Sequence, residues 1–556
     1  MYYLLFIVLL LIFVGVYLLY GNKRAQEEKL LHIRRKWGKP EEKSWNSKQL
    51  YAYHNYCNSS QKNALSDTIA EDIDLDQVFA FTDRTNSRPG EQYLYQQLRS
   101  GHKDPIALKE LDVQAEEFAG NSGLREKVEM ELAQLAHKDA YYIHELFSTQ
   151  YNALYSGGLR LYIKLAAAIW IISLVLTVVL QNQFLFLLSL GLTLFNFYLH
   201  YSNKKKISSY VHSLPQLYVL VKTSKKLLKL NERTANGKII KSIAQLGPLQ
   251  RSLSYVNFQN YANNDPSDLI SGILELIKTL LVIEPAMFLV SVDRINEQRE
   301  NIEALFNFVG KTDMAVAVAS LRESLPVYCK PEFTADGTAL NIRDLYHPLV
   351  ENCVANSILV PPAEGVLITG SNMSGKTTFI RSMAINALLS QTLFTSCSSS
   401  YQAPLLQIFT SIRMSDDLEE HKSYFQSEAL SILDILQRSQ SGSGSLIIID
   451  EIFRGTNTIE RVAAAKAILS HLAQHRNFVF VSTHDLELAE LLGKEYAVYS
   501  FEEKVSDARL IFDYKIKPGI LKNKNGIAIL SSLGYPASVI KDAYAIGDAL
   551  RKKYEL

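Results

Sequence analysis

The segment GVLITGSNMSGKTT, residues 365–378, determines how the rest of the chain is interpreted. Its apolar residues 366–368 predict a short buried strand, and the apolar periodicity of residues 379–393 predicts a helix. Between them, Gly370-x-x-x-x-Gly375-Lys376-Thr377 fits the phosphate-binding P-loop pattern. A chance match in a turn rich in serine and glycine is the alternative. The strand before the motif and the helix after it favour a phosphate site.

The residue types of this motif suit a nucleotide phosphate. Glycines at both ends let backbone N–H groups point at an anion, and the N-terminus of the following helix adds partial positive charge. We predict that Lys376 neutralises the terminal phosphates and that the Thr377 hydroxyl ligates Mg²⁺. The predicted ATP-binding residues are Gly370, Ser371, Asn372, Met373, Ser374, Gly375, Lys376, Thr377 and Thr378.

Two later apolar strands end in polar side chains. Residues 446–449 lead into Asp450 and Glu451, and residues 478–481 lead into a Ser-Thr-His sequence that ends at His484. We predict that Asp450 holds Mg²⁺ through water, and that Glu451 orients or deprotonates the attacking water. His484 is predicted to sense the γ-phosphate or to polarise the water. Surface acids and structural histidines are the plainer alternatives, and the P-loop in the same domain favours catalysis.

Composition limits the function classes. The 556 residues suffice for about three or four domains. The 58 Lys and Arg residues nearly balance the 57 Asp and Glu residues, so any nucleic-acid binding requires a local basic patch. The four cysteines lack metal-ligand spacing and suit a reducing compartment, and we expect them to pack as small apolar residues. They are Cys57, Cys329, Cys353 and Cys397.

Three apolar runs predict membrane-spanning helices. Residues 2–20 are uncharged and basic residues follow them, which is typical of an uncleaved anchor with its N-terminus outside. Residues 165–180 and 184–201 have basic residues on their outer flanks and predict a hairpin over 161–201. Buried core helices are the alternative for this pair. The pattern predicts a multi-pass protein of the inner, cytoplasmic membrane with its carboxyl-terminal domain in the cytosol.

From about Asn341 to Asp548 the chain resembles the ATPase domain of the MutS mismatch-repair family. The motifs that carry this resemblance occur together and in order. They are His347-Pro348-Leu349-Val350-Glu351, TGSNMSGKTT at 369–378, Ser415-Asp416-Asp417-Leu418 with Ser423-Tyr424-Phe425 and Glu428, Asp450-Glu451-Ile452 with Arg454-Gly455-Thr456, Ser482-Thr483-His484, and Gly526-Ile527 through Gly534-Tyr535-Pro536 to Val539-Ile540.

The resemblance implies a fold and a mechanism. It implies an α/β P-loop NTPase domain of the ABC-like, MutS type that hydrolyses ATP with Mg²⁺. It also implies a homodimer in which Ser423 of one subunit completes the phosphate site of the other, with Asn372 beside the attacking water. DNA is a further partner that the family implies. ATP binding would then change the subunit geometry, and helical arms would relay the change.

The resemblance also suggests a domain plan. We expect an anchor at 1–21, a juxtamembrane linker at 22–71, an all-α core and lever domain at 72–330 interrupted by the hairpin, an ATPase domain at 331–520 and a helix-turn-helix dimerisation element at 521–556. The sequence lacks a Gly-x-Phe-x-Glu mismatch-reading motif, and residues 1–71 are too few for the family's mismatch-binding and connector domains. His421, Ser371 and Phe453 also depart from the family's usual residues. ATP hydrolysis is therefore expected, whereas mismatch recognition is not.

Two other function classes compete with a membrane-anchored MutS-like ATPase. One is half of an ABC-type transporter, although three spans are few for a transport path. The SGSG run at 441–444 also lies too close to the Asp450 strand to begin that family's signature helix. The other is a membrane scaffold that has lost catalysis and acts on a protein partner. Lys376, Asp450 and Glu451 argue against the scaffold.

Overall fold

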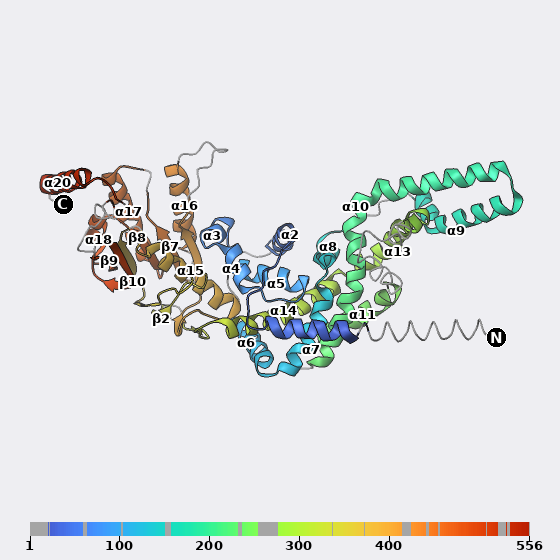
Figure 1. Cartoon of the computed structure of the whole chain (residues 1–556), viewed down its shortest axis with the longest axis horizontal. Helices are drawn as coiled ribbons and strands as arrows, with labels where there is room; N and C mark the ends of the chain where they lie inside the picture. The colour runs from blue at the N-terminus through green and yellow to red at the C-terminus, as the bar shows by residue number, and fades with distance from the viewer. Residues whose placement is uncertain are drawn as a thin grey trace. The chain divides into compact units, whose positions relative to one another are not determined.

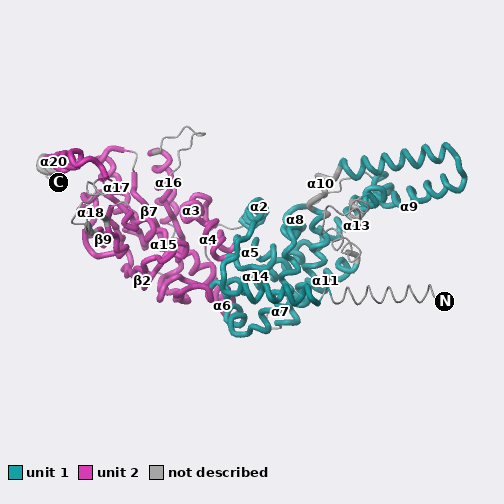
Figure 2. The backbone as a smooth tube through the Cα atoms, in the orientation of Figure 1, with its two compact units in different colours: residues 1–60, 83–96, 114–321 teal, residues 61–82, 97–113, 322–556 magenta. Residues whose placement is uncertain are grey.

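The chain folds into two compact units that are each assembled from separate segments (Figure 2). Unit 1 comprises residues 1–60, 83–96 and 114–321, and unit 2 comprises residues 61–82, 97–113 and 322–556. The computed structural model describes residues 21, 23–58, 64–101, 104–150, 157–231, 236–253, 276–335, 337–371, 373–413, 424–440, 444–453, 456–506, 509–520, 530 and 534–554. The predicted anchor at 2–20 lies outside the described residues.

All regular secondary structure in the described residues of unit 1 is helical (Figure 1), which confirms the prediction of a helical amino-terminal part. Residues 23–36 form its first described helix. The helices that follow in unit 1 are α2 Ser47–Asn58, α5 Arg88–Arg99 (whose residues from 97 belong to unit 2), α7 Ser122–Leu132, η1 Ala133–Leu135, η2 Lys138–His144, α8 Glu145–Ser148, α9 Gly157–Leu180, α10 Gln183–Leu230, α11 Gly237–Leu253, α13 Ile283–Glu297 and α14 Arg299–Ser324 (whose residues from 322 belong to unit 2).

The predicted hairpin is formed by α9 and the first part of α10, which project together from the rest of unit 1 (Figure 1). The side chain of Asn182 accepts a hydrogen bond from the Phe184 N–H and so caps the start of α10. Helix α10 is 48 residues long and continues past the hairpin, with Pro215 inside it. Since residues 202–214 contain neither glycine nor proline, no residue there interrupts the helix.

Three described helices are long and apolar enough to cross a membrane: α9, residues 183–202 of α10, and α14. They differ in burial, because the most apolar window is 17% buried in α9 and 22% buried in α10 but 83% buried in α14. We therefore assign α14 to the core of unit 1. The hairpin leaves its apolar side chains exposed, which argues against the alternative of buried core helices.

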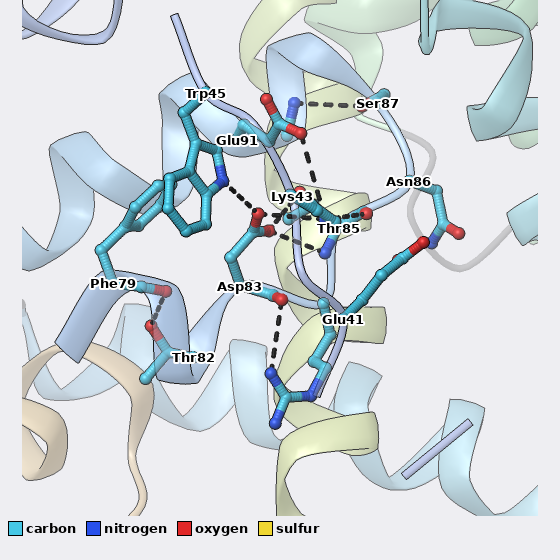
Figure 3. Close-up of polar contacts among 12 residues, drawn as sticks. Glu41, Lys43, Trp45, Phe79, Thr82, Asp83, Thr85, Asn86, Ser87 and Glu91 are labelled. Atoms are coloured by element: carbon cyan, nitrogen blue, oxygen red, sulfur yellow. Dashed lines mark hydrogen bonds and ion pairs between the residues drawn. The ribbon is translucent and has the colours of Figure 1, made fainter. Parts of the chain in front are cut away.

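A buried polar network holds the segment after residue 36 within unit 1. The Asp83 carboxylate is fully buried and accepts hydrogen bonds from Lys43 Nζ, Trp45 Nε1 and the Thr85 N–H, each at 3.0 Å. Figure 3 shows Lys43, Trp45 and Thr85 gathered around this carboxylate. Buried polar groups need such partners, since an unpaired one costs about 1–3 kcal/mol. The network therefore attaches residues 43–45 to the start of α5.

The first turn of α5 depends on a second buried carboxylate. Asp313 on α14 accepts from the backbone N–H groups of Asn86 at 2.9 Å and Ser87 at 2.8 Å. A Cβ atom on Gly90 would lie 2.1 Å from Asp313 Oδ2, so only glycine fits there. The Pro89-Gly90 pair, which the sequence marks as an interruption, lies inside this first turn because proline is compatible with that position.

Unit 1 should lose stability as the pH rises from about 4.5 to neutrality. Burial raises the pKa of Glu91 and that of Glu129 to about 7 each, above the roughly 4.3 of an unfolded chain. The folded state therefore binds these protons more tightly, and the free energy of unfolding falls between about pH 4.5 and pH 7. We expect Glu91→Gln to flatten this slope and to stabilise unit 1 above pH 7, on the order of 1–3 kcal/mol.

The measurement is denaturant unfolding at several pH values, followed by tryptophan fluorescence. All three tryptophans, Trp37, Trp45 and Trp170, belong to unit 1, so the signal reports on this unit. Glu126→Gln is the matched control, because the bond from Arg34 lowers the pKa of Glu126. A wild-type slope that persists in Glu91→Gln would contradict the prediction.

Unit 2 contains two β-sheets and the helices around them. The larger sheet has six strands in the order β10-β9-β4-β8-β7-β6, and the smaller has four in the order β1-β5-β2-β3. Strands β4, β6, β7, β8 and β9 pair in parallel, while β10 is antiparallel to β9. The strands are β1 Glu332–Phe333, β2 Leu340–Leu345, β3 Asn356–Val360, β4 Gly365–Gly370, β5 Ser400–Ala403, β6 Gln407–Ser411, β7 Ser445–Asp450, β8 Phe478–Thr483, β9 Tyr496–Ser506 and β10 Arg509–Pro518.

The helices of unit 2 come from both halves of the sequence. They are α3 Asp67–Asp72, α4 Leu75–Thr82, α6 Pro105–Gly120 (whose residues from 114 belong to unit 1), α15 Lys376–Leu393, α16 Tyr424–Arg438, α17 Thr458–Ala473, α18 Leu486–Leu492 and α20 Ala537–Tyr554. Of the predicted dimerisation element, α20 is described and residues 526–527 lie outside the described residues. The unit is thus α/β with mixed sheets.

The central strands of the larger sheet carry the three motifs predicted from the sequence. Every residue of β4, β7 and β8 is buried, as expected for parallel strands covered on both faces. Because these strands are parallel and adjacent, their carboxyl ends meet at one edge of the sheet. Gly365 begins β4 where a Cβ atom would lie 2.0 Å from the Tyr496 ring. The sheet therefore brings residues 370, 450 and 483 to one place.

Candidate active site

The loop between β4 and α15 has the backbone that the P-loop pattern predicts. Gly370 has a φ of +152° and Gly375 a φ of +106°, both in the region that favours glycine. A Cβ atom on Gly370 would lie 2.9 Å from Ser374 Oγ and 3.0 Å from the Phe501 carbonyl oxygen. The Ser374 hydroxyl closes the loop by donating to the Ser371 carbonyl at 2.8 Å. Asn372 lies outside the described residues.

Lys376 begins α15 with its ammonium group turned back over this loop. Its Nζ donates to the carbonyl oxygens of Gly370 and Ser371, each at 2.8 Å, and lies 3.4 Å from His484 Nε2. The side chain is 5% exposed. A buried ammonium group above a loop of glycines, at the N-terminus of a helix, is well placed to bind an anion.

Thr377 and Asp450 form a pair of oxygen ligands beside the loop. The Thr377 hydroxyl donates to Asp450 Oδ2 at 2.9 Å, and the Ser482 hydroxyl donates to the other oxygen, Oδ1. One hydroxyl and one carboxylate are the hard oxygen donors that Mg²⁺ prefers when substrate phosphates supply further ligands. The donor set therefore fits the predicted cation, with Ser482 orienting the carboxylate.

Glu451 and His484 form an acid–base pair at the same edge of the sheet. His484 Nε2 lies 2.9 Å from Glu451 Oε1. The Glu451 backbone has a φ of +58°, which is uncommon for a residue with a side chain, and its N–H donates to the Ser482 carbonyl at 3.0 Å. Such strained backbone is concentrated at functional sites. The turn after Glu451 is stabilised by Glu428, whose side chain accepts a hydrogen bond from the Phe453 N–H.

A cavity of about 520 Å³ lies beside the loop. It is lined by Lys376, Thr377 and Glu451, by residues 350–354, and by Phe501 and Tyr514. The volume lies within the range of small-molecule sites, roughly 300–1,000 Å³. The two aromatic residues were missed from the sequence, because they belong to β9 and β10, which carry no motif.

The structure thus brings together most of the predicted site residues. Lys376, Thr377, Asp450, Glu451 and His484 converge at the carboxyl ends of β4, β7 and β8. Ser371, Met373 and Thr378 line the cavity. The predicted residues Asn372 and Ser423, with residues 414–422 and 454–455, lie outside the described residues. Glu503, which accepts a hydrogen bond from the Ser371 hydroxyl, is a site neighbour that no motif predicted.

Comparison with known proteins agrees with this geometry. The model of MutS domain V matches residues 366–551. The chain is 29% identical over 312 residues to the DNA mismatch repair protein MutS of Caldanaerobacter subterraneus subsp. tengcongensis, which covers 54% of this chain and 35% of the relative. It is 30% identical over 275 residues to the DNA mismatch repair protein MutS of Thermus thermophilus, covering 49% and 33% respectively.

A eukaryotic relative shows the same pattern. MutS protein homolog 4 of Mus musculus is 30% identical over 296 residues, which is 50% of this chain and 30% of the relative. The chain therefore spans about a third of the length of each of these relatives. The matches support the motif-based resemblance and give no support to the transporter alternative. The carboxyl-terminal part of this chain, residues 366–551, is therefore a MutS-family domain.

Proposed function

We propose that this protein is a membrane-anchored ATPase related to mismatch repair, in which ATP hydrolysis in a homodimer moves the helical unit. The observation that carries the proposal is the convergence of three functional groups at one edge of the sheet. These groups are the ammonium of Lys376, the Thr377–Asp450 oxygen pair and the Glu451–His484 pair. Together they supply an anion site, a cation site and a base at one edge of the sheet.

The residues that line the cavity have different roles in binding the substrate. Lys376 and the loop amides bind the terminal phosphates of ATP, where the helix N-terminus adds to the attraction. Residues 350–354, with Phe501 and Tyr514, offer apolar and aromatic surface to the rest of the nucleotide. Thr377 and Asp450 would hold Mg²⁺, which when bound neutralises developing phosphate charge.

Glu451 and His484 position the attacking water. The Glu451 carboxylate accepts a proton from, or orients, a water aligned with the terminal phosphate. His484 holds that carboxylate at 2.9 Å and also lies 3.4 Å from Lys376 Nζ, so it can respond to whatever the ammonium binds. The Ser482 hydroxyl, at the end of the neighbouring strand β8, donates to Asp450 and so fixes the orientation of that carboxylate. The fixed geometry removes reorganisation from the chemical step.

The homodimer and a DNA ligand are part of the proposal because the matched relatives are named DNA mismatch repair proteins. Ser423 of one subunit would complete the phosphate site of the other, and Asn372 would lie beside the attacking water. The near balance of charge over the chain makes a local basic patch necessary for DNA binding.

ATP hydrolysis by the detergent-solubilised full chain tests this function directly. The rate is measured alone and with homoduplex, mismatched and branched DNA at a stated salt concentration. Mg²⁺-dependent hydrolysis establishes the ATPase, and a rate that changes with one DNA structure identifies the ligand. A chain that neither binds nor hydrolyses ATP would contradict the proposal and leave the scaffold alternative.

The membrane anchor rests on the hairpin of α9 and α10 together with residues 2–20. We propose that the hairpin spans the inner, cytoplasmic membrane and that the ATPase domain faces the cytosol. The hairpin is held together by polar contacts, with Trp170 Nε1 donating to Thr193 Oγ1 at 2.8 Å and Tyr162 OH to Asn196 Oδ1 at 2.7 Å. Its remaining surface is the exposed apolar surface that a bilayer covers.

Deleting residues 2–20 and 161–201 together should release soluble protein. Because α9 and the first part of α10 form a hairpin, joining residue 160 to residue 202 removes both of its arms together. The measurement is fractionation of cell membranes, with ATP hydrolysis of the soluble fraction as the test of folding. The two single deletions are the controls, and each should leave the protein in the membrane fraction. Membrane association of the double deletion would show that a further anchor exists.

A further inference from the structure

Asp74 joins two elements of unit 2 that build the candidate site. Its carboxylate binds Arg381 Nη1 at 3.1 Å and Arg413 Nη2 at 2.8 Å. Arg381 is on α15, the helix that begins with Lys376, and Arg413 follows β6. One carboxylate therefore ties the helix of the anion site to the end of a strand in the same sheet.

Asp72 strengthens the same junction from the end of α3. It is 1% exposed, and its two oxygens accept the N–H groups of Ile412 at 3.0 Å and Arg413 at 2.7 Å. Arg413 Nη1 donates in addition to the Glu71 carbonyl at 3.2 Å. Burial raises the pKa of Asp72, and these N–H groups offset part of that cost. The end of β6 is thus fixed by the backbone and by the side chain of Arg413.

The junction also reaches the segment that leads into cavity-lining residues 350–354. His347 is buried near Arg381 and Asp74, and burial together with the Arg381 charge lowers its pKa to about 4. It is therefore neutral at physiological pH, and its Nδ1 accepts the Leu349 N–H at 3.3 Å. Residues 350–354, which line the cavity, follow directly. Asp74 is thus the acidic member of a cluster with Arg381, Arg413 and His347. The cluster connects α15, the end of β6 and the segment that leads into residues 350–354.

We propose that Asp74 is a positioning residue for the nucleotide reaction. Together with Asp72 it forms a clamp, which holds α15 and the end of β6 in one geometry. This inference rests on the ATPase function proposed above. Asp74 does not line the cavity, so it acts through the elements it holds. Helix α15 is buried along nearly its whole length, and a shift at Arg381 must displace Lys376, little more than one turn away, with it.

The backbone conformation of Asp74 supports a positioning role for this residue. Asp74 has a φ of +53°, a conformation that costs a residue with a side chain about 1–3 kcal/mol and persists only where surroundings impose it. Helix α4 follows at once and ends at residue 82, after which the chain passes into unit 1. The clamp is therefore separated from that passage only by α4.

The test compares Asp74→Asn with a matched variant of the same unit, Asp112→Asn. Asp112 also bridges two cations, Arg322 at 2.6 Å and Lys330 at 3.0 Å, and its side chain is 17% exposed against 16% for Asp74. A purely structural role predicts that both substitutions lower thermal stability alike and leave the kinetics unchanged. A positioning role predicts a kinetic effect in Asp74→Asn alone.

Steady-state ATP hydrolysis and hydrogen exchange are measured on the full chain in detergent. We expect Asp74→Asn to lower kcat by ~10- to 100-fold, the size of effect that a small misplacement of reacting groups produces, with KM changed by less than about threefold. Asp74→Glu, which keeps the charge, should recover most of the loss. Peptides covering 376–393 and 407–413 should exchange faster in Asp74→Asn and remain at the wild-type rate in Asp112→Asn.

Each outcome decides the matter. A wild-type kcat in Asp74→Asn, or an equal loss in Asp112→Asn, would overturn the positioning role. If the wild-type chain hydrolyses no ATP, the proposed function fails on its own, and the exchange arm still tests the clamp. In that case unchanged exchange at 376–393 and 407–413 in Asp74→Asn would overturn the inference, whereas faster exchange in both peptides would support it.

Discussion

Glu451→Gln is expected to abolish ATP turnover while nucleotide binding persists. The substitution keeps the size and the hydrogen-bonding capacity of the side chain but removes the carboxylate that can accept a proton from water. Loss of a general base typically costs ~10²- to 10⁴-fold in rate. Binding should survive because the anion site is formed by Lys376 and the loop amides, which the substitution leaves in place.

The two consequences are measured separately. Phosphate release gives kcat, and the binding of a fluorescent ATP analogue gives Kd. Glu460→Gln, an exposed glutamate in the first turn of α17, is the control and should keep the wild-type rate. The substitution should leave the fold intact, since the Glu451 side chain is 26% exposed and its contact with His484 Nε2 can be kept by an amide oxygen. Unchanged hydrolysis would remove Glu451 from the mechanism.

The anion site could be predicted from the sequence because local chemistry specifies it. Gly370 and Gly375 occupy backbone conformations that glycine adopts most readily, and Lys376 follows at a fixed spacing. Asp450 and His484 could be placed nearby because each ends an apolar run, and the carboxyl ends of adjacent parallel strands meet at one edge. Their proximity therefore follows from the sheet itself.

Other features could not be predicted, because they depend on residues that are distant in sequence. Phe501 reaches the cavity through the pairing of β9 with β4, and Tyr514 through the pairing of β10 with β9. Asp72 and Asp74 belong, by sequence, to the beginning of the helical part, yet they contact Arg413 across more than three hundred residues. The assignment of residues 61–82 and 97–113 to unit 2 arises in the same way. No periodicity within a segment reveals such partners.

A mixture of two inactive variants should recover activity if the site is shared between subunits. Lys376→Ala removes the ammonium that binds the phosphates, and Ser423→Ala removes the serine that we propose acts on the partner's nucleotide. In either homodimer, both sites then lack one required residue, so each homodimer should be inactive. A mixed dimer has one site with both halves intact, because the two defects fall together in its other site.

The expected recovery is quantitative. Random reassortment of equal amounts makes half of the dimers mixed, and each mixed dimer has one working site of two, so the mixture should reach about a quarter of the wild-type rate. The measurement is ATP hydrolysis after the variants are co-expressed with different tags, with separately purified and unmixed homodimers as controls. If each nucleotide were bound and hydrolysed within one subunit, mixing would add nothing to the sum of the homodimers. Full activity in the Ser423→Ala homodimer would equally exclude the shared site, since the serine could then not be needed by either nucleotide.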